Sequence, residues 1–193
     1  MKAIVEAALE GTPKPSWFTH YDHGSDYAMW GDDEKPIIDL DNLDKLAGMH
    51  VYCMNCSSGK GLGAHAIAKG ILEYLGYNDV VSFTTDAAKE FGEVFGWGLV
   101  EAIKTGSFLK DVVENMRQHG YDIAADLSSK GQLLAAGSMV QDMNILHVYY
   151  EGGPAPPEPS CPFSSALLKL GGWNFLWFWR MLRQKLRPES RPG

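Results

Sequence analysis

Two apolar runs, each followed directly by reactive side chains, constrain this chain more than any other feature. Residues 17–21 lead into Asp22-His23-Gly24, and residues 49–54 lead into Asn55-Cys56 about thirty positions later. Short aromatic and β-branched runs bounded by Pro, Gly and Asp predict buried strands. An imidazole and a thiol are therefore expected at two strand ends, where a parallel sheet presents its functional groups.

The segment between these runs is acidic and predicts a connecting helix. Residues 41–46 have helical character, with Asp41 as the expected cap and Gly48 as the expected end. A strand, a helix and a second strand in this length form a right-handed βαβ unit with parallel strands. The carboxyl ends of the two strands then meet at one edge of the sheet.

This arrangement would make His23 and Cys56 neighbours. A thiol becomes a competent nucleophile beside a base, and an imidazole across the strand ends supplies one. Gly24 has no Cβ to shield its backbone N–H, so with the N–H of Cys56 it is a candidate to bind an oxyanion. The sequence therefore predicts cysteine-peptidase chemistry at this edge.

The two dipeptides His23-Gly24 and Asn55-Cys56 resemble the dyad motifs of caspase-like cysteine peptidases, which include caspases, gingipains, clostripain, separase and bacterial CHAT-type domains. The similarity spans roughly residues 16–154. It implies an α/β fold, a caspase-like three-layer sandwich with a mostly parallel central sheet. It also implies a cysteine endopeptidase in which Cys56 attacks the scissile carbonyl and His23 protonates the leaving amine. Gly24 and Cys56 would hold the oxyanion, without any metal or organic cofactor.

The beginning of the chain departs from the family pattern. A caspase-like domain normally has two strands before the strand that carries the histidine, whereas residues 1–11 predict only a short helix. The sheet is thus expected to lack its first strands. Three explanations stay open: a truncated copy, a trimmed fold, or a second chain that completes the sheet.

Asp86 is the candidate for substrate binding. A strand over residues 80–84 is expected beside the strand that leads to Cys56, so Thr85-Asp86 would emerge at the same edge. In the separase-like pattern that this stretch resembles, the aspartate lines the pocket for the residue before the scissile bond. That implies a preference for Arg over Lys. The alternative is that Asp86 only caps the helix expected over residues 87–104.

The remaining pattern is α/β. Apolar residues at helical spacing predict further helices, and the expected last strand precedes Gly152-Gly153. The predicted elements are helices over 64–74, 108–118 and 123–136 and a strand over 143–150.

Composition sets the class of protein and its surroundings. The chain has 193 residues, 45% of them hydrophobic, which suffices for one well-packed core. A net charge of −7 argues against nonspecific binding to nucleic acid. Three cysteines, an odd number, and no basic-then-apolar leader favour a reducing, cytoplasmic location.

The end of the chain differs in kind. Residues 1–151 are expected to form the peptidase domain, residues 152–162 a linker rich in Pro and Gly, and residues 163–193 a basic aromatic helix. This last segment has six Lys or Arg and one Glu, against eleven and twenty-three in residues 1–162. It is expected to dock on its own acidic domain, or to bind a membrane surface or a partner protein.

Two other functions stay open beside peptide hydrolysis. The spacing Cys53-x-x-Cys56 also occurs in thiol oxidoreductases and zinc sites. However, side chains three residues apart on a strand point to opposite faces, so Cys53 is expected to be a buried core thiol. A catalytically inactive caspase fold that acts as a binding or regulatory module is the second alternative.

Overall fold

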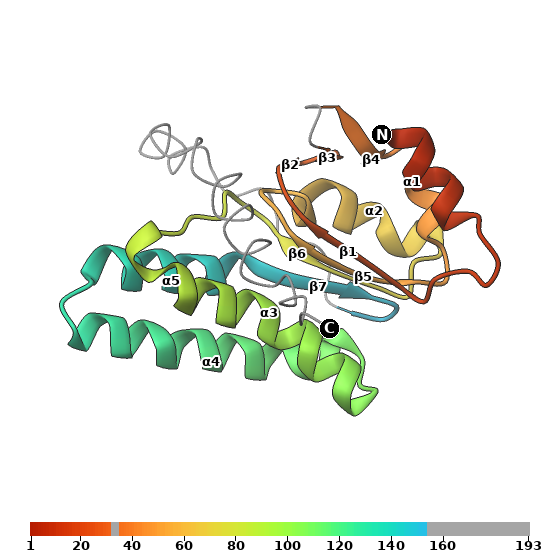
Figure 1. The fold of residues 1–193 in the computed structure, drawn as a ribbon. Helices are drawn as coiled ribbons and strands as arrows, with labels where there is room; N and C mark the ends of the chain where they lie inside the picture. The colour runs from red at the N-terminus through yellow and green to blue at the C-terminus, as the bar shows by residue number, and fades with distance from the viewer. Residues whose placement is uncertain (32–34, 154–193) are drawn as a thin grey trace, which may run out of the picture. The chain divides into compact units, whose positions relative to one another are not determined.

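The computed structural model describes residues 1–31 and 35–153, and these form a mixed α/β fold with two sheets (Figure 1). The expected segment 163–193, Cys161 and most of the predicted linker lie outside the described residues. The helices are α1 Lys2–Leu9, α2 Ala64–Ala66, α3 Ala88–Thr105, α4 Leu109–Ser129 and α5 Leu133–Ile145. The strands are β1 Trp17–Tyr21, β2 Gly24–Ser25, β3 Ala28–Trp30, β4 Pro36–Asp39, β5 His50–Met54, β6 Glu73–Tyr77 and β7 Leu146–Tyr150.

The larger sheet has the strand order β1-β5-β6-β7, with the first three strands parallel and β7 antiparallel. The strands predicted over 17–21 and 49–54 are confirmed. They pair in parallel register from Trp17 opposite His50 to Tyr21 opposite Met54. Consequently β1 and β5 end side by side, and the segments that carry His23 and Cys56 leave the sheet together. Among the described residues, no strand pairs with the outer edge of β1.

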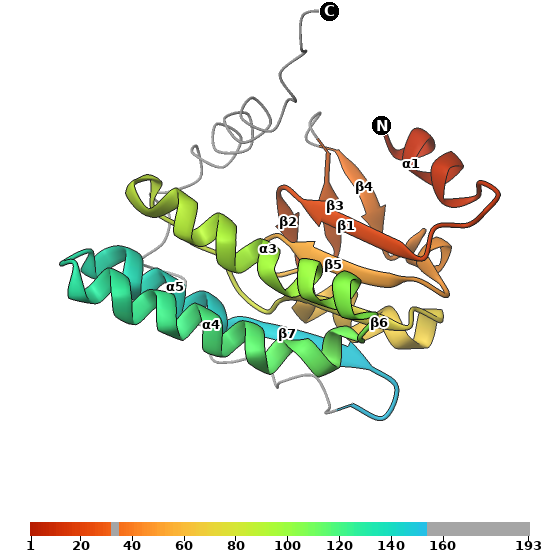
Figure 2. The same cartoon turned by 60° about the horizontal axis from the view of Figure 1, so that its bottom comes forward.

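Helices cover both faces of this sheet (Figure 1 and Figure 2). The three long helices α3, α4 and α5 lie on one face, whereas α2, α1 and the small sheet lie on the other. Side chains alternate between these faces along β5. Val51 and Cys53 join the core with Met29 of β3, while the Tyr52 hydroxyl donates to the Phe95 carbonyl of α3 at 2.7 Å.

The connection between β1 and β5 is not the single helix that the sequence predicts. It contains the antiparallel sheet β2-β3-β4 and only a short 3₁₀ helix, η1, Leu43–Leu46. Asn42, not Asp41, occupies the position before this helix, and no side-chain cap forms there. The parallel pairing of β1 and β5 survives because a crossover requires only enough chain to return to the same edge.

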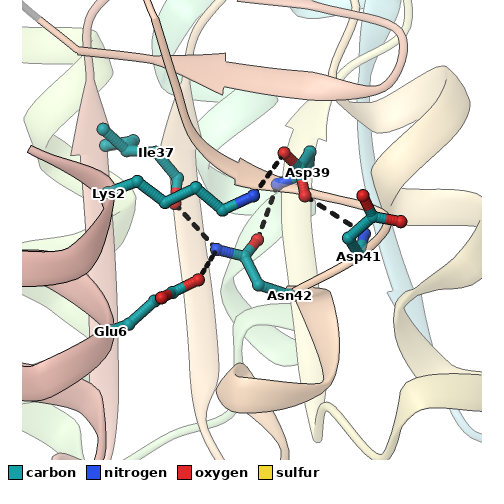
Figure 3. Close-up of polar contacts among 6 residues, drawn as sticks. All are labelled: Lys2, Glu6, Ile37, Asp39, Asp41 and Asn42. Atoms are coloured by element: carbon teal, nitrogen blue, oxygen red, sulfur yellow. Dashed lines mark hydrogen bonds and ion pairs between the residues drawn. The ribbon is translucent and has the colours of Figure 1, made fainter.

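The side chain of Asn42 joins the first helix to the small sheet (Figure 3). Its amide donates to Glu6 of α1 at 2.8 Å and to the Ile37 carbonyl at 3.0 Å, and its oxygen accepts the Asp39 backbone N–H at 2.8 Å. Lys2 of α1 forms an ion pair with Asp39 at 2.6 Å. The predicted N-terminal helix is confirmed, and these hydrogen bonds and the ion pair connect it to β4 and to the residue before η1.

The predictions for residues 64–84 are confirmed only at their start, where residues 64–69 are helical. A turn of π-helix, η2 Gly59–Gly63, leads into α2 and the 3₁₀ helix η3, Ile67–Lys69, which Gly70 ends in the left-handed conformation (φ 81°). The next segment is the strand β6, not a helix, and residues 80–84 are irregular. Every residue of β6 is buried. The sequence therefore lacks the alternation of polar and apolar residues that indicates a half-exposed strand.

The helix expected over 87–104 is confirmed as α3, but the two later helices have different limits. Helix α4 continues through Gly120, where the sequence predicts a stop, and α5 begins ten residues later than expected. A Cβ at Gly120 would lie 2.5 Å from the Met143 side chain, so this glycine allows α4 and α5 to approach closely. No helix in the described part of the chain is long and apolar enough to cross a membrane.

Candidate functional site

The segments His23-Gly24 and Asn55-Cys56 meet where β1 and β5 end. A Cβ at Gly24 would lie 2.7 Å from the Cys56 carbonyl oxygen and 2.9 Å from the Asn55 Cβ. The backbone at position 24 thus packs directly on the backbone that carries the thiol. His23 is exposed, and its backbone N–H donates to the Asp22 carboxylate at 2.7 Å. The structure therefore brings the predicted dyad segments to one edge of the sheet.

Cys56 is a partly buried free thiol in the loop after β5. Its Sγ lies 3.9 Å from the Val81 carbonyl oxygen in the irregular segment after β6. Burial raises the pKa of the Cys56 thiol, and the nearby Asp79 carboxylate adds to this effect. The resting thiol is thus protonated at neutral pH, so attack on a carbonyl needs a base to take its proton.

Cys53 has different surroundings. It is completely buried, its thiol lies 3.7 Å from the Met29 sulfur, and burial raises its pKa to about 12. Cys53 and Cys56 therefore have different neighbours, Met29 of β3 and the Val81 carbonyl. A disulfide between them would require the loop after β5 to move.

A buried polar network lies beneath the loop that carries Cys56. Asn55 Nδ2 and His20 Nδ1 are 2.8 Å apart, and His20 Nε2 lies 3.0 Å from the Trp30 carbonyl oxygen. The Ser58 hydroxyl donates to the Asn55 amide oxygen. Because the amide nitrogen can only donate and the carbonyl can only accept, His20 must carry its proton on Nε2. His20 is buried, and burial lowers its pKa, so the ring is neutral.

The backbone just after Cys56 adopts an unusual conformation. Ser57 has a φ of 60°, and among the described residues it is the only residue other than glycine with a positive φ. Its N–H donates to the Asp79 carbonyl at 3.0 Å, which ties the loop to the end of β6. Such conformations cost free energy and persist where surrounding contacts hold them, often at functional sites.

Asp86 follows the irregular residues 80–84 that come after β6. It is fully exposed in the 3₁₀ turn η4, Thr85–Ala87, and Ala87 occupies the position before α3. Asp86 is thus not the N-cap of this helix, contrary to the capping interpretation. The segment before it passes Cys56 at Val81, although the strand predicted over 80–84 does not form. The role of Asp86 in substrate binding stays a prediction.

Asp142 on α5 is a buried group near Cys56 that the sequence analysis missed. It is fully buried, one carboxyl oxygen accepts the Ser82 N–H at 3.0 Å, and the other has no partner in the described structure. Burial raises the pKa of Asp142 well above its ordinary value. Asp142 lies at helical spacing from the core residues Ala135 and Met139, and this spacing is the sequence pattern that could have indicated its burial.

The raised pKa of Asp142 makes stability fall as pH rises. The folded chain keeps the proton that the unfolded chain releases above about pH 4, so unfolding is favoured progressively at higher pH. Asp142→Asn should remove this dependence: between pH 5 and 8 the wild type should lose about 1–3 kcal/mol of unfolding free energy relative to the variant. Thermal or urea unfolding across this range measures it.

The exposed substitution Asp122→Asn on α4 controls for the change in net charge. Parallel stability profiles for the wild type and Asp142→Asn would show that Asp142 is ionised in the folded protein and would contradict the prediction.

No cluster of three His, Cys, Asp or Glu side chains within residues 1–31 and 35–153 is arranged to hold a metal ion. Comparison with known proteins gave no further guide, since no family model, no curated protein and no solved structure matches this chain. The assignment of a function therefore depends on the residues and their geometry.

Proposed function

We propose that this chain is a caspase-like cysteine endopeptidase with Cys56 as nucleophile and His23 as its general base and acid. The observation that carries the proposal is the packing of Gly24 against Asn55 and Cys56, which unites the two dyad segments at the carboxyl edge of parallel strands. A partly exposed thiol and a strained residue directly after it add support.

The proposed reaction begins when His23 takes the proton of Cys56 and the sulfur attacks the scissile carbonyl carbon. The N–H groups of Gly24 and Cys56 would stabilise the resulting oxyanion. Collapse of the tetrahedral intermediate transfers the proton from His23 to the leaving amine and leaves a thioester. His23 then deprotonates a water molecule, which hydrolyses the thioester and restores the thiol.

Labelling with a peptidyl acyloxymethyl ketone tests this proposal directly. The thiolate displaces the carboxylate of the probe, so a covalent adduct requires an activated cysteine and a peptide pocket. Mass spectrometry should find the adduct on Cys56. No adduct should form when the protein is heat-denatured before the probe is added, or when His23→Ala is used. An adduct mainly on Cys53 or Cys161, or no adduct at all, would contradict it.

The same probes test the proposed substrate preference. If Asp86 binds the residue before the scissile bond, a probe with Arg should label faster than one with Lys, and a probe with Asp slowest. Asp86→Ala should remove this ranking without a comparable loss of stability, because Asp86 is exposed. An unchanged ranking would place the specificity pocket elsewhere.

An inactive caspase fold that binds a partner is the second candidate. The raised pKa of Cys56 favours it, since a protonated thiol is a poor nucleophile. In the described part of the chain no strand pairs with the outer edge of β1, and a strand from a second chain would extend the sheet there. Absence of labelling together with a dimer in sedimentation experiments would favour this candidate. A labelled monomer would exclude it.

A further inference from the structure

We propose that His20 is a positioning residue for the nucleophile, because its neutral ring connects β3, through the Trp30 carbonyl, to the loop of Cys56, through Asn55. This inference rests on the proposed function. In this arrangement His20 acts on the thiol through its hydrogen-bonded neighbour Asn55.

The His20 ring is held at both nitrogens. His20 is 7% exposed, and it accepts from Asn55 Nδ2 and donates to the Trp30 carbonyl, at 2.8 and 3.0 Å. Two opposed hydrogen bonds fix both the tautomer and the rotation of an imidazole. A ring held in this way is poorly placed to exchange protons during catalysis, which leaves that task to His23.

Asn55 connects the His20 ring to the loop that carries Cys56. The oxygen of its amide accepts from the Ser58 hydroxyl, so the amide cannot rotate without breaking bonds on both sides. Asn55 and Ser58 flank Cys56 and the strained Ser57, and both are buried. The network therefore spans the part of the loop whose conformation aims the thiol.

Asn55 also packs against Gly24, the residue that follows the dyad histidine. The Cβ and Cγ of Asn55 form the surface against which Gly24 packs. A shift of Asn55 would change the position of Cys56 and its separation from the His23-Gly24 backbone together. Misplacement of reacting groups by about 1 Å can cost on the order of 100-fold in rate.

Two substitutions separate positioning from simple support. An asparagine at position 20 places its oxygen where Nδ1 lies, so His20→Asn should keep the bond to Asn55 and lose the bond to Trp30. A glutamine reaches the position of Nε2, so His20→Gln should keep the bond to Trp30 and lose the bond to Asn55. If His20 acts through Asn55, His20→Gln should lower kcat by about 10–100-fold with KM nearly unchanged, and His20→Asn by less than about 5-fold.

Thermal unfolding of both variants, measured beside the kinetics, shows whether either substitution lowers the stability of the fold. Equal losses of kcat in the two variants, or a greater loss in His20→Asn, would overturn the proposal and leave His20 as support for β3. Ser58→Ala should lower kcat in the same way, and its effect should not add to that of His20→Gln in the double variant. Additive effects would also count against the network.

A readout that does not depend on turnover keeps the inference distinct from the proposed function. Nitrogen NMR of the wild type should show His20 as the Nε2–H tautomer, and a proton on Nδ1 would overturn the network. The alkylation rate of Cys56 by iodoacetamide should change in His20→Gln and not in His20→Asn. If the wild type cleaves no peptide but these two results hold, the peptidase proposal fails while the positioning role stands.

Discussion

Cys56→Ala should abolish peptide cleavage, with a fall in kcat of at least about 10⁴-fold. The proposed reaction forms a thioester at this sulfur, and the other described thiol, Cys53, is completely buried. His23→Ala should reduce kcat by about 10²–10⁴-fold, because a general base and acid contributes that much. Steady-state cleavage of a peptide library measures both effects.

Cys53→Ala is the matched control for this experiment. Cys53 is buried in the hydrophobic core, so its removal should cost about 1 kcal/mol of stability through a small cavity and leave kcat within a few-fold of the wild type. An active Cys56→Ala variant, or an inactive but folded Cys53→Ala variant, would contradict the assignment of Cys56 as the nucleophile and Cys53 as a core thiol.

Gly24→Ala should disturb both dyad segments at once. The added methyl would lie 2.7 Å from the Cys56 carbonyl oxygen and 2.9 Å from the Asn55 side chain, which is closer than real Cβ contacts allow. The ends of β1 and β5 would have to separate, and His23 would move away from the thiol. We expect kcat to fall by more than about 100-fold and stability by about 1–3 kcal/mol.

Gly137→Ala provides the control for this substitution. Gly137 lies exposed on α5 with no heavy atom within 4 Å of an added Cβ, so the change should stabilise the fold by about 0.5–1 kcal/mol and leave cleavage unchanged. Circular dichroism and thermal unfolding distinguish loss of the site from loss of the fold. A folded Gly24→Ala variant with wild-type kcat would show that the close packing at position 24 is not needed.

The sequence alone was sufficient for the strands that lead to the site. The runs at 17–21 and 49–54 are aromatic and β-branched and end at polar residues, so local composition identifies them without knowledge of their neighbours. Their parallel pairing followed from the length of chain between them. The juxtaposition of His23-Gly24 with Asn55-Cys56 could therefore be predicted from local pattern and strand order.

Elements that are buried on all sides could not be predicted in this way. Strand β6 has no polar face to reveal its period, and its apolar residues also fit a helix. Glycine often ends a helix, so the sequence predicts a helix end at Gly120. In the structure Gly120 lies inside α4, where the absence of a side chain lets Met143 approach closely. In both cases a contact distant in sequence determines the local structure.

The same distinction applies to the candidate site. The sequence determined that a thiol and an imidazole follow adjacent parallel strands, because the chemistry of these residues and the order of the strands are local properties. Only the tertiary structure decided that His20 is neutral and held by Asn55 and Trp30, and that Asp142 is buried near Cys56. Burial and hydrogen-bond partners set the protonation of both groups, and those partners come from segments that only folding brings together.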